Sequence, residues 1–142
     1  MKDYKSLSHT RWDCKYHVVF IPKKRKKVID GNLRNYLGEI LHELAKQKGI
    51  EIVEGHLMRD HVHRCLSIPP KIVVSSVVGY LKGKSAIAIT RKFKGRQRNF
   101  TGEHFWARGY FVSTVGLDEG IVREYIRHQE SQDEYFDQSS WI

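Results

Sequence analysis

The tripeptide His61-Val62-His63 lies in a stretch typical of a β-strand, and its two imidazoles are the first candidates for chemistry. Alternate residues of a strand point to the same face of a sheet, so His61 and His63 are expected side by side, with Val62 pointing the other way. Two neutral imidazoles at this spacing can bind one metal ion together. The alternative is two unrelated surface histidines, because His-x-His tripeptides are common.

Two further residues extend this candidate metal site. Asp60 directly precedes the pair, and it either orients a histidine ligand through a hydrogen bond or simply ends a turn. Gln129 lies four residues after Tyr125, so the two share one face of a predicted helix. Two histidines and the amide oxygen of Gln129 would make a three-ligand site that suits Mg²⁺ or Mn²⁺ better than structural zinc, which prefers thiolates and a closed shell.

Tyr125 is the candidate nucleophile. A free phenol has a pKa near 10 and is a weak nucleophile, but a metal ion that polarises a phosphodiester changes this. Attack would give a phosphotyrosine, which keeps the bond energy for later rejoining, whereas a hydrolytic nuclease activates water and stores nothing. Ile121, Val122 and Ile126 also form an apolar stripe with Tyr125, and from spacing alone a core tyrosine is the more common outcome. His128 lies near this site or, more commonly for such a residue, at the surface.

The pattern of apolar residues predicts the elements that position these side chains. Runs of aromatic and β-branched residues predict strands at 12–21, 50–58, 60–68 and 105–115. Apolar residues at helical spacing predict helices at 32–49, 72–93 and 119–136, the last capped by Asp118. Gly79 and Gly83 weaken the second helix and favour a bend or an interruption there.

This order of elements predicts an α+β fold. The βαββαβ succession is that of a ferredoxin-like sandwich, with an antiparallel sheet and helices on one face. We expect one domain over residues 1–142, with a core at about 12–115 and a C-terminal helix at about 118–136 that carries Tyr125. That helix is an appendage that moves or packs on another subunit.

Composition narrows the class of partner. The chain has 142 residues and a formal net charge of +9, which favours a polyanion, nucleic acid ahead of a membrane surface. No apolar run approaches the roughly 20 residues of a membrane helix, and no secretory signal is visible. Cys14 and Cys65 lack metal-ligand spacing and are most simply reduced thiols of a cytoplasmic protein.

Four short stretches, in order, carry a resemblance to a known family. They are "DHVH…LSIPP", "YLKGKSA", "HFWARGYFVSTVG" and "YIRHQE". Together they resemble the insertion-sequence-two-hundred-like transposases, which are small single-tyrosine HUH transposases, where HUH means His, a bulky apolar residue, His. The match runs from about Tyr16 to Glu130, nearly the whole chain.

The resemblance implies a mechanism and partners. It implies a ferredoxin-like fold, with His61, His63 and Gln129 as metal ligands and Tyr125 as the nucleophile. It also implies action on single-stranded DNA with hairpins near the element ends. A 5′-phosphotyrosine and a free 3′-OH form, and the ends are later rejoined. Family members are homodimers in which the tyrosine helix can complete the partner's site, and we expect a prokaryotic cytoplasmic protein that joins the nucleoid while it acts.

With single-stranded and hairpin DNA as the partner, phosphate contacts are expected from the clusters of basic residues. The candidates are Lys23, Lys24, Arg25, Lys82, Lys84, Arg91, Lys92 and Arg98. The aromatic residues Phe105, Trp106 and Tyr110 would stack on bases or, as strand aromatics more often do, fill the core.

Arg64 and Cys65 stand where the family usually carries apolar residues. Arg64 alternates with the two histidines, so it is expected to point with Val62 and Leu66. If that face is covered by helices, a guanidinium lies in or beside the core, where it is costly unless it reaches solvent or an acid.

Two other classes of function compete with the transposase. A ferredoxin-like sheet can bind RNA without catalysis, but such modules need exposed aromatic residues on the central strands, and the third predicted strand has none. A relaxase or replication-initiator nuclease would use the same chemistry, and the short chain without a second domain disfavours it.

Overall fold

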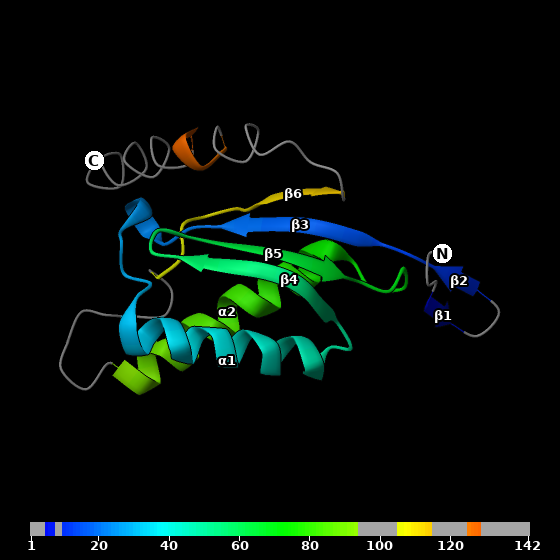
Figure 1. The fold of residues 1–142 in the computed structure, drawn as a ribbon, viewed down its shortest axis with the longest axis horizontal. Coiled ribbons are helices and arrows are strands. Elements are labelled where there is room, and N and C mark those ends of the chain that lie inside the picture. Colours follow the sequence, from blue (N-terminus) through cyan, green and yellow to red (C-terminus); the bar gives the residue numbers. More distant parts are fainter. Residues whose placement is uncertain (1–4, 8–9, 94–104, 115–124, 129–142) are drawn as a thin grey trace.

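The structure, a computed structural model, describes residues 5–7, 10–93, 105–114 and 125–128. A two-stranded hairpin, β1 (Lys5–Leu7) and β2 (Thr10–Trp12), precedes the main elements. The main elements, shown in Figure 1, are β3 (Lys15–Phe20), α1 (Gly31–Gln47), β4 (Glu51–Met58), β5 (His61–Ser67), α2 (Val74–Phe93) and β6 (Phe111–Thr114). A short 3₁₀ turn, η1 (Lys23–Arg25), follows β3.

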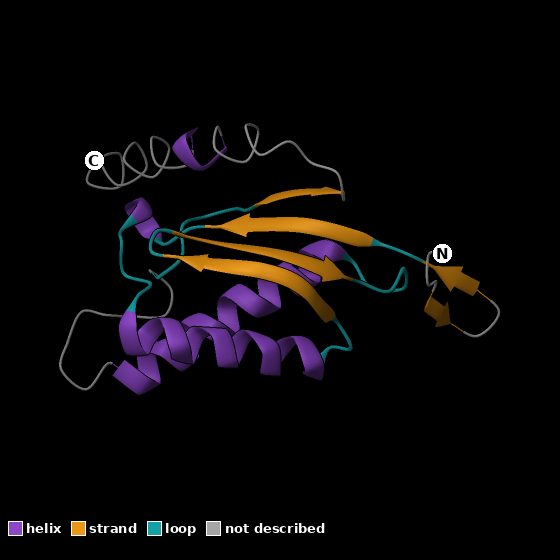
Figure 2. Ribbon diagram, in the orientation of Figure 1, coloured by secondary structure: helices purple, strands orange, loops and turns teal. Residues whose placement is uncertain are grey.

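Four strands form an antiparallel sheet in the order β4-β5-β3-β6. Both long helices cover one face of this sheet, and the helical residues 125–128 lie on the other (Figures 1 and 2). The predicted α+β, ferredoxin-like βαββαβ arrangement is confirmed. Within the described residues, no helix is both long and apolar enough to cross a bilayer.

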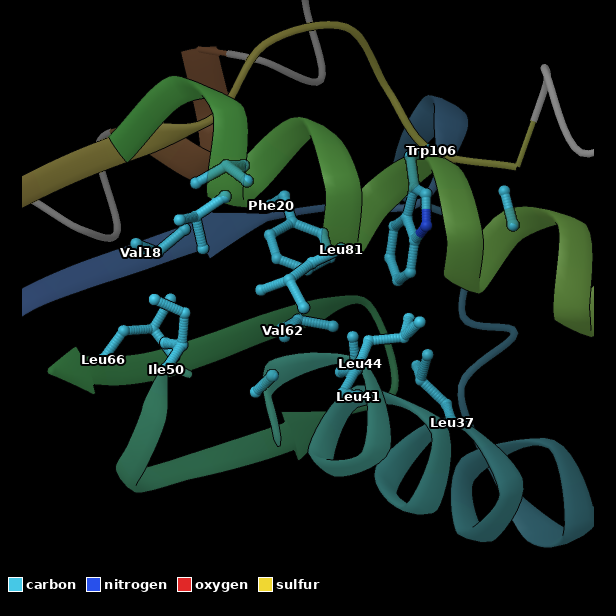
Figure 3. Close-up of a cluster of buried hydrophobic side chains, with 14 of the residues drawn as sticks. Val18, Phe20, Leu37, Leu41, Leu44, Ile50, Val62, Leu66, Leu81 and Trp106 are labelled. Carbon is cyan, nitrogen blue, oxygen red and sulfur yellow. The ribbon is translucent and has the colours of Figure 1, made fainter. Parts of the chain in front are cut away.

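The main core lies between the sheet and the two helices (Figure 3). Val18 and Phe20 of β3 and Val62 and Leu66 of β5 alternate along their strands and are almost completely buried. They pack with helical residues that include Leu37, Leu41, Leu44, Val78 and Leu81. Complete burial of one such side chain stabilises the fold by about 1.5–3 kcal/mol, so this face dominates stability.

Arg64 also points to the helix-covered face, as its alternation with the histidines predicts. Only 7% of the residue is exposed, and its strand partner on the edge strand β4 is Gly55. A Cβ atom at Gly55 would lie 2.5 Å from Cδ and 2.6 Å from Nη1 of Arg64, so the arginine side chain runs across the glycine. Burial lowers the pKa of the guanidinium, and its Nε has no hydrogen-bond partner among the described residues.

Two predicted strand boundaries were wrong. Trp12 belongs to the separate strand β2, and β3 begins at Lys15. The strand predicted from residue 105 begins only at Phe111, and before it Trp106 forms an isolated bridge to Pro22. The physical reason is core packing, because the Trp106 ring meets Phe20 at 4.7 Å between ring centroids and donates a hydrogen bond from Nε1 to Ser85. The aromatic residues before Phe111 therefore gave the sequence pattern of a strand although they pack in the core outside one.

The helix α2 runs without interruption through Gly79 and Gly83, so the bend or interruption expected there is absent. A glycine costs about 1 kcal/mol relative to alanine inside a helix. Val77, Val78, Leu81 and Ile89 bury their side chains against the sheet and the neighbouring helix, which outweighs that cost.

Candidate active site

The sheet face opposite α1 and α2 carries four histidines from three strands. We call it the histidine face; its members are His17 of β3, His56 of β4, and His61 and His63 of β5. Strand pairing places them together, because His63 is the direct partner of Val19 on one side and of His56 on the other. Val62, between the two predicted ligands, is completely buried on the opposite face. Alternation along β5 thus places His61 and His63 as the sequence predicts.

His61 is held by a carboxylate. Its Nδ1 lies 2.9 Å from Oδ1 of Asp60, which occupies the turn between β4 and β5. The other carboxylate oxygen of Asp60 lies 3.4 Å from Nε of Arg25. Since an ionised carboxylate only accepts, Nδ1 of His61 donates, and in the neutral imidazole Nε2 keeps its lone pair. A metal-binding histidine usually has such a partner on its other nitrogen, which sets the tautomer and the ring orientation.

The turn η1 brings Arg25 to this carboxylate. Lys24 and Arg25 both adopt positive φ angles, 59° and 49°, which non-glycine residues rarely occupy. A hydrogen bond of 2.9 Å from the Lys23 amide to the Phe105 carbonyl anchors the start of the turn. Backbone strain of this kind persists where the surroundings hold it, commonly near functional sites. Here it accompanies the contact of the basic turn with Asp60.

His63 stands between two further imidazoles that the sequence analysis did not select. Its Nε2 lies 3.1 Å from Nδ1 of His17, and the ring centroids are 5.2 Å apart. On the other side the His56 ring lies 6.2 Å away. Alternation along β3 could have placed His17 on the face opposite the core residues Val18 and Phe20, but the register that brings it to His63 cannot be read from the sequence.

Tyr125 lies on the same side of the sheet as the histidines. Residues 125–128 are helical, and Ile126 is buried against Val19 and Ile21 in a second, smaller apolar cluster. The Tyr125 ring packs against Phe111 at 5.2 Å between centroids. Since Val19 is the strand partner of His63, this helical segment covers part of the histidine face. Tyr125 is half-buried and lies outside the main core, and Gln129 falls outside the described residues.

Cys65 shares this face and is buried there. Burial raises its pKa, and the nearby negative charge of Glu54 raises it further. The Glu54 carboxylate is the direct strand partner of Cys65 and so lies on the same face, beside the imidazoles.

The predicted DNA-contacting cations divide between the two sides of the sheet. Lys23, Lys24 and Arg25 lie in η1, next to Asp60 and the histidine face. Lys82, Lys84, Arg91 and Lys92 lie on α2, on the opposite side, and Arg98 lies outside the described residues. Lys82 is engaged within the fold, because its ammonium lies 2.8 Å from the Ala107 carbonyl and 2.5 Å from that of Gly109. Of the aromatic candidates, Phe105 and Trp106 fill the core.

Comparison with known proteins identifies the family. The family described as "Transposase IS200 like" matches residues 10–129, which is most of the chain. This chain belongs to the IS200-like transposase family. It is 44% identical, over 99% of its length and 92% of the relative's, to the transposase for insertion sequence element IS200 of Salmonella typhimurium. DNA transposition is therefore the broad activity of this IS200-like transposase.

Solved structures carry the same fold. A Deinococcus radiodurans protein assigned as a transposase superposes with a TM-score of 0.79 at 30% identity, covering 91% of this chain and 98% of the other. A REP-associated tyrosine transposase, solved bound to a REP hairpin, gives a TM-score of 0.55 at 12% identity, with 89% and 68% covered. At that low identity the second likeness concerns the fold alone.

Two imidazoles on the histidine face of this IS200-like transposase are the candidate donors for a divalent cation. Within the described ranges, no three His, Cys, Asp or Glu side chains come close enough to hold a metal ion. His61 and His63 supply two neutral nitrogen donors, and Asp60 leaves Nε2 of His61 available. A carboxylate that faces the far side of a ligand ring is typical of metal sites in proteins. The described residues thus include two of the three predicted ligands, and the third, Gln129, lies outside them.

Proposed function

We propose that this transposase cleaves and rejoins single-stranded DNA at the ends of its insertion sequence, with Tyr125 as the nucleophile and one Mg²⁺ or Mn²⁺ ion. His61, His63 and Gln129 would hold the ion. The observation that carries the proposal is the placement of Tyr125 and the histidine pair on one side of the sheet, joined through Val19.

The chemistry follows from these residues. When bound, the divalent ion would polarise the scissile phosphate and so increase its reactivity. The Tyr125 oxygen attacks phosphorus, the bond from phosphorus to the 3′ oxygen breaks, and a 5′-phosphotyrosine and a 3′-OH result. The proton lost by the phenol is matched by the proton that the 3′ oxygen gains. Attack by a 3′-OH on the phosphotyrosine reverses these steps and joins DNA ends without an external energy source.

The packing around Tyr125 supports a role in positioning. Ile126 is buried against Val19 and Ile21, so the helical turn is docked by its apolar side. The Tyr125 ring lies against Phe111, which limits the directions in which the hydroxyl can point. A nucleophile held close to its target reacts much faster than a free one.

The DNA substrate is proposed to carry hairpins near the element ends. A transposase that shares the fold was solved bound to a REP hairpin, and the basic turn at Lys23–Arg25 lies beside the histidine face. Phosphate contacts from this turn, together with the other basic candidates, would hold single-stranded DNA near Tyr125. The active form is proposed to be a homodimer in which the tyrosine helix of one chain can serve the site of the other.

A labelled single-stranded DNA that carries the end hairpin of the element tests the proposal. The unaltered protein, incubated with Mg²⁺ or Mn²⁺ and run on a denaturing gel, is expected to give a covalent protein–DNA band that chelator removes. Tyr125→Phe is expected to give none while keeping its thermal unfolding midpoint and its hairpin binding. A band of normal intensity from Tyr125→Phe would eliminate Tyr125 as the nucleophile.

Tyr80→Phe is the matched control. Tyr80 lies on α2, on the other side of the sheet, where its hydroxyl donates a 2.6 Å hydrogen bond to Gln47. Its substitution removes the same hydroxyl far from the histidines, and the covalent band should remain. Hairpin binding without any band from the unaltered protein would instead favour a binding protein without catalysis.

A further inference from the structure

We propose that Lys82 is a positioning residue for the helical turn at 125–128, and not a phosphate contact. Its ammonium holds in place the segment before β6, on which that turn docks. The effect on cleavage rests on the proposed function, because Tyr125 is the proposed nucleophile. The inference concerns the two hydrogen bonds that the ammonium donates, one of 2.8 Å to the Ala107 carbonyl and one of 2.5 Å to that of Gly109.

Residues 105–109 lead into β6 (Figure 1) and pass from one side of the sheet to the other. Near the start of this segment, the Trp106 ring packs in the main core on the helix-covered side. The next side chain, Ala107, belongs to the second apolar cluster, together with Val19 and Ile126. Since Ala107 is only 3% exposed, it forms part of the surface on which the helical turn sits.

Hydrogen bonds hold this crossing segment from two directions. On the side of β3, the Ala107 amide donates a 2.8 Å bond to the Ile21 carbonyl. On the side of α2, the Trp106 indole donates a 3.0 Å bond to the Ser85 hydroxyl. The Lys82 ammonium reaches further along the segment, to Gly109, whose φ of 75° is a conformation that glycine adopts without strain.

The segment held by Lys82 leads directly to the neighbours of Tyr125. Strand β6 begins two residues after Gly109 with Phe111, whose ring packs on Tyr125 at 5.2 Å between centroids. Ala107, which packs with Ile126, and Phe111 therefore lie on either side of Gly109 in the chain. Without the ammonium, two carbonyls lose a charged donor and the segment can shift. A displacement of about 1 Å at a reacting group can lower a rate on the order of 10²-fold.

The alternative role of Lys82 is the phosphate contact predicted from the sequence. An ammonium has three donors, and the Ala107 and Gly109 carbonyls occupy two of them. Lys82 also lies on α2, on the side of the sheet opposite the histidine face. Loss of a phosphate contact would weaken DNA binding and reduce its salt dependence, whereas loss of a positioning contact would leave both unchanged and affect Tyr125.

The first measurement observes Tyr125 without any DNA. Protein grown with 3-fluorotyrosine carries seven labelled tyrosines, and the fluorine resonance that Tyr125→Phe lacks belongs to Tyr125. Lys82→Met keeps the unbranched stem and removes the ammonium. In this variant we expect the Tyr125 resonance to move toward its position in the denatured protein. Lys82→Arg, whose guanidinium can donate to two carbonyls, is expected to restore most of the original shift.

Two variants control for charge and for general loss of stability. Lys46→Met removes an exposed lysine of α1, on the same side of the sheet as Lys82. Leu44→Ala weakens the main core, where Leu44 is only 6% exposed, at a place remote in the chain from residues 105–109. Both should leave the Tyr125 resonance in place at temperatures well below unfolding, and thermal unfolding checks that each variant is folded.

The second measurement separates DNA binding from cleavage in the full-length protein. Hairpin affinity is titrated at several salt concentrations, and the rate of covalent adduct formation is measured at saturating DNA with Mg²⁺ or Mn²⁺. For Lys82→Met, affinity and salt dependence should match those of the unaltered protein, while the rate should fall by about 10–100-fold. Lys82→Arg should recover most of the lost rate.

Each contrary outcome overturns a stated part of the inference. Weaker hairpin binding by Lys82→Met, with a salt slope reduced by about one, would make Lys82 a phosphate contact. An unmoved Tyr125 resonance in folded Lys82→Met, or an equal shift in Leu44→Ala, would overturn the positioning role. If Tyr125→Phe still forms the adduct, the proposed function fails, and the fluorine resonance still decides whether Lys82 positions the helical turn.

Discussion

The two faces of the one sheet differ in what surrounds their side chains. On the helix-covered face, Val18, Phe20, Val62 and Leu66 are almost fully enclosed by apolar groups. On the histidine face, imidazoles are half-exposed and bonded to polar partners, His61 to Asp60 and His63 to His17. Both faces are built from the same strands, and in β5 the two environments alternate from one residue to the next.

This difference separates stability from chemistry. Burial of apolar area supplies most of the folding free energy, and here the larger apolar cluster lies on the helix-covered side, with a smaller one around Val19 and Ile21 on the other. The other side is free to hold groups that would be costly in a core, because water and the neighbouring side chains can satisfy them. In β5, even-numbered positions point to the helix-covered face and odd-numbered positions to the histidine face. Substitutions at even positions should therefore affect mainly folding, and those at the histidines mainly catalysis.

The largest effect is expected from His61→Ala combined with His63→Ala. If the metal contributes several kilocalories per mole to the reaction, its loss should lower the rate of DNA cleavage by at least about 10³-fold. The free energy of unfolding should change little, because both side chains are half-exposed. Rates of adduct formation and denaturant unfolding curves measure the two quantities.

Leu66→Ala, on the same strand and the opposite face, is the control for that double variant. Leu66 is completely buried, so its truncation should cost about 2–5 kcal/mol of stability. Its cleavage rate, measured well below the unfolding temperature, should stay close to that of the unaltered protein. If Leu66→Ala loses cleavage as strongly as the histidine variant does, the two faces are not separable in this way.

Much of the difference between the two faces of the sheet was predictable from the sequence. Alternation in His61-Val62-His63 placed Val62 inside and the histidines outside, and helical spacing at Leu37, Leu41 and Leu44 located the first helix. These patterns are local, so they need no knowledge of which strands pair. The ferredoxin-like order followed from the succession of elements.

The features that were missed depend on contacts distant in sequence. His17 meets His63 only because of the register between β3 and β5, which no local pattern encodes. The strand predicted from residue 105 failed because Trp106 packs on Phe20, where aromatic character serves the core. The roles of Gln129 and Tyr125 stay predictions.

An intermediate effect is expected from Gly55→Ala. At this position the side chain of Arg64 and the backbone of His63 both lie close to the glycine. The new Cβ would lie 2.5 Å from Cδ of Arg64 and 2.5 Å from the backbone carbonyl oxygen of His63. Relief of this clash requires movement of β4 or β5, and overpacking of this kind typically costs about 1–3 kcal/mol. Chemical denaturation measures the loss.

The Gly55→Ala variant also tests how tightly the faces are coupled. A shift of the His63 backbone would displace its imidazole, so Mn²⁺ affinity should fall together with stability. Stability lost at unchanged Mn²⁺ affinity would mean that the strain is absorbed on the helix side, by movement of Arg64. Unchanged stability would contradict the close approach of Arg64 to Gly55.

The smallest effect is expected from Arg64→Met, and its sign is the informative part. The buried Nε of Arg64 has no hydrogen-bond partner among the described residues, so the guanidinium loses hydration without full compensation. Methionine keeps an unbranched apolar stem across Gly55 and removes the charge, so stability should rise by about 1 kcal/mol. DNA cleavage should not change, because Arg64 points away from the histidine face. A loss of stability would mean that the interactions of the guanidinium with its surroundings outweigh the cost of its burial. The helix-covered face would then depend on a charged group for part of its stability.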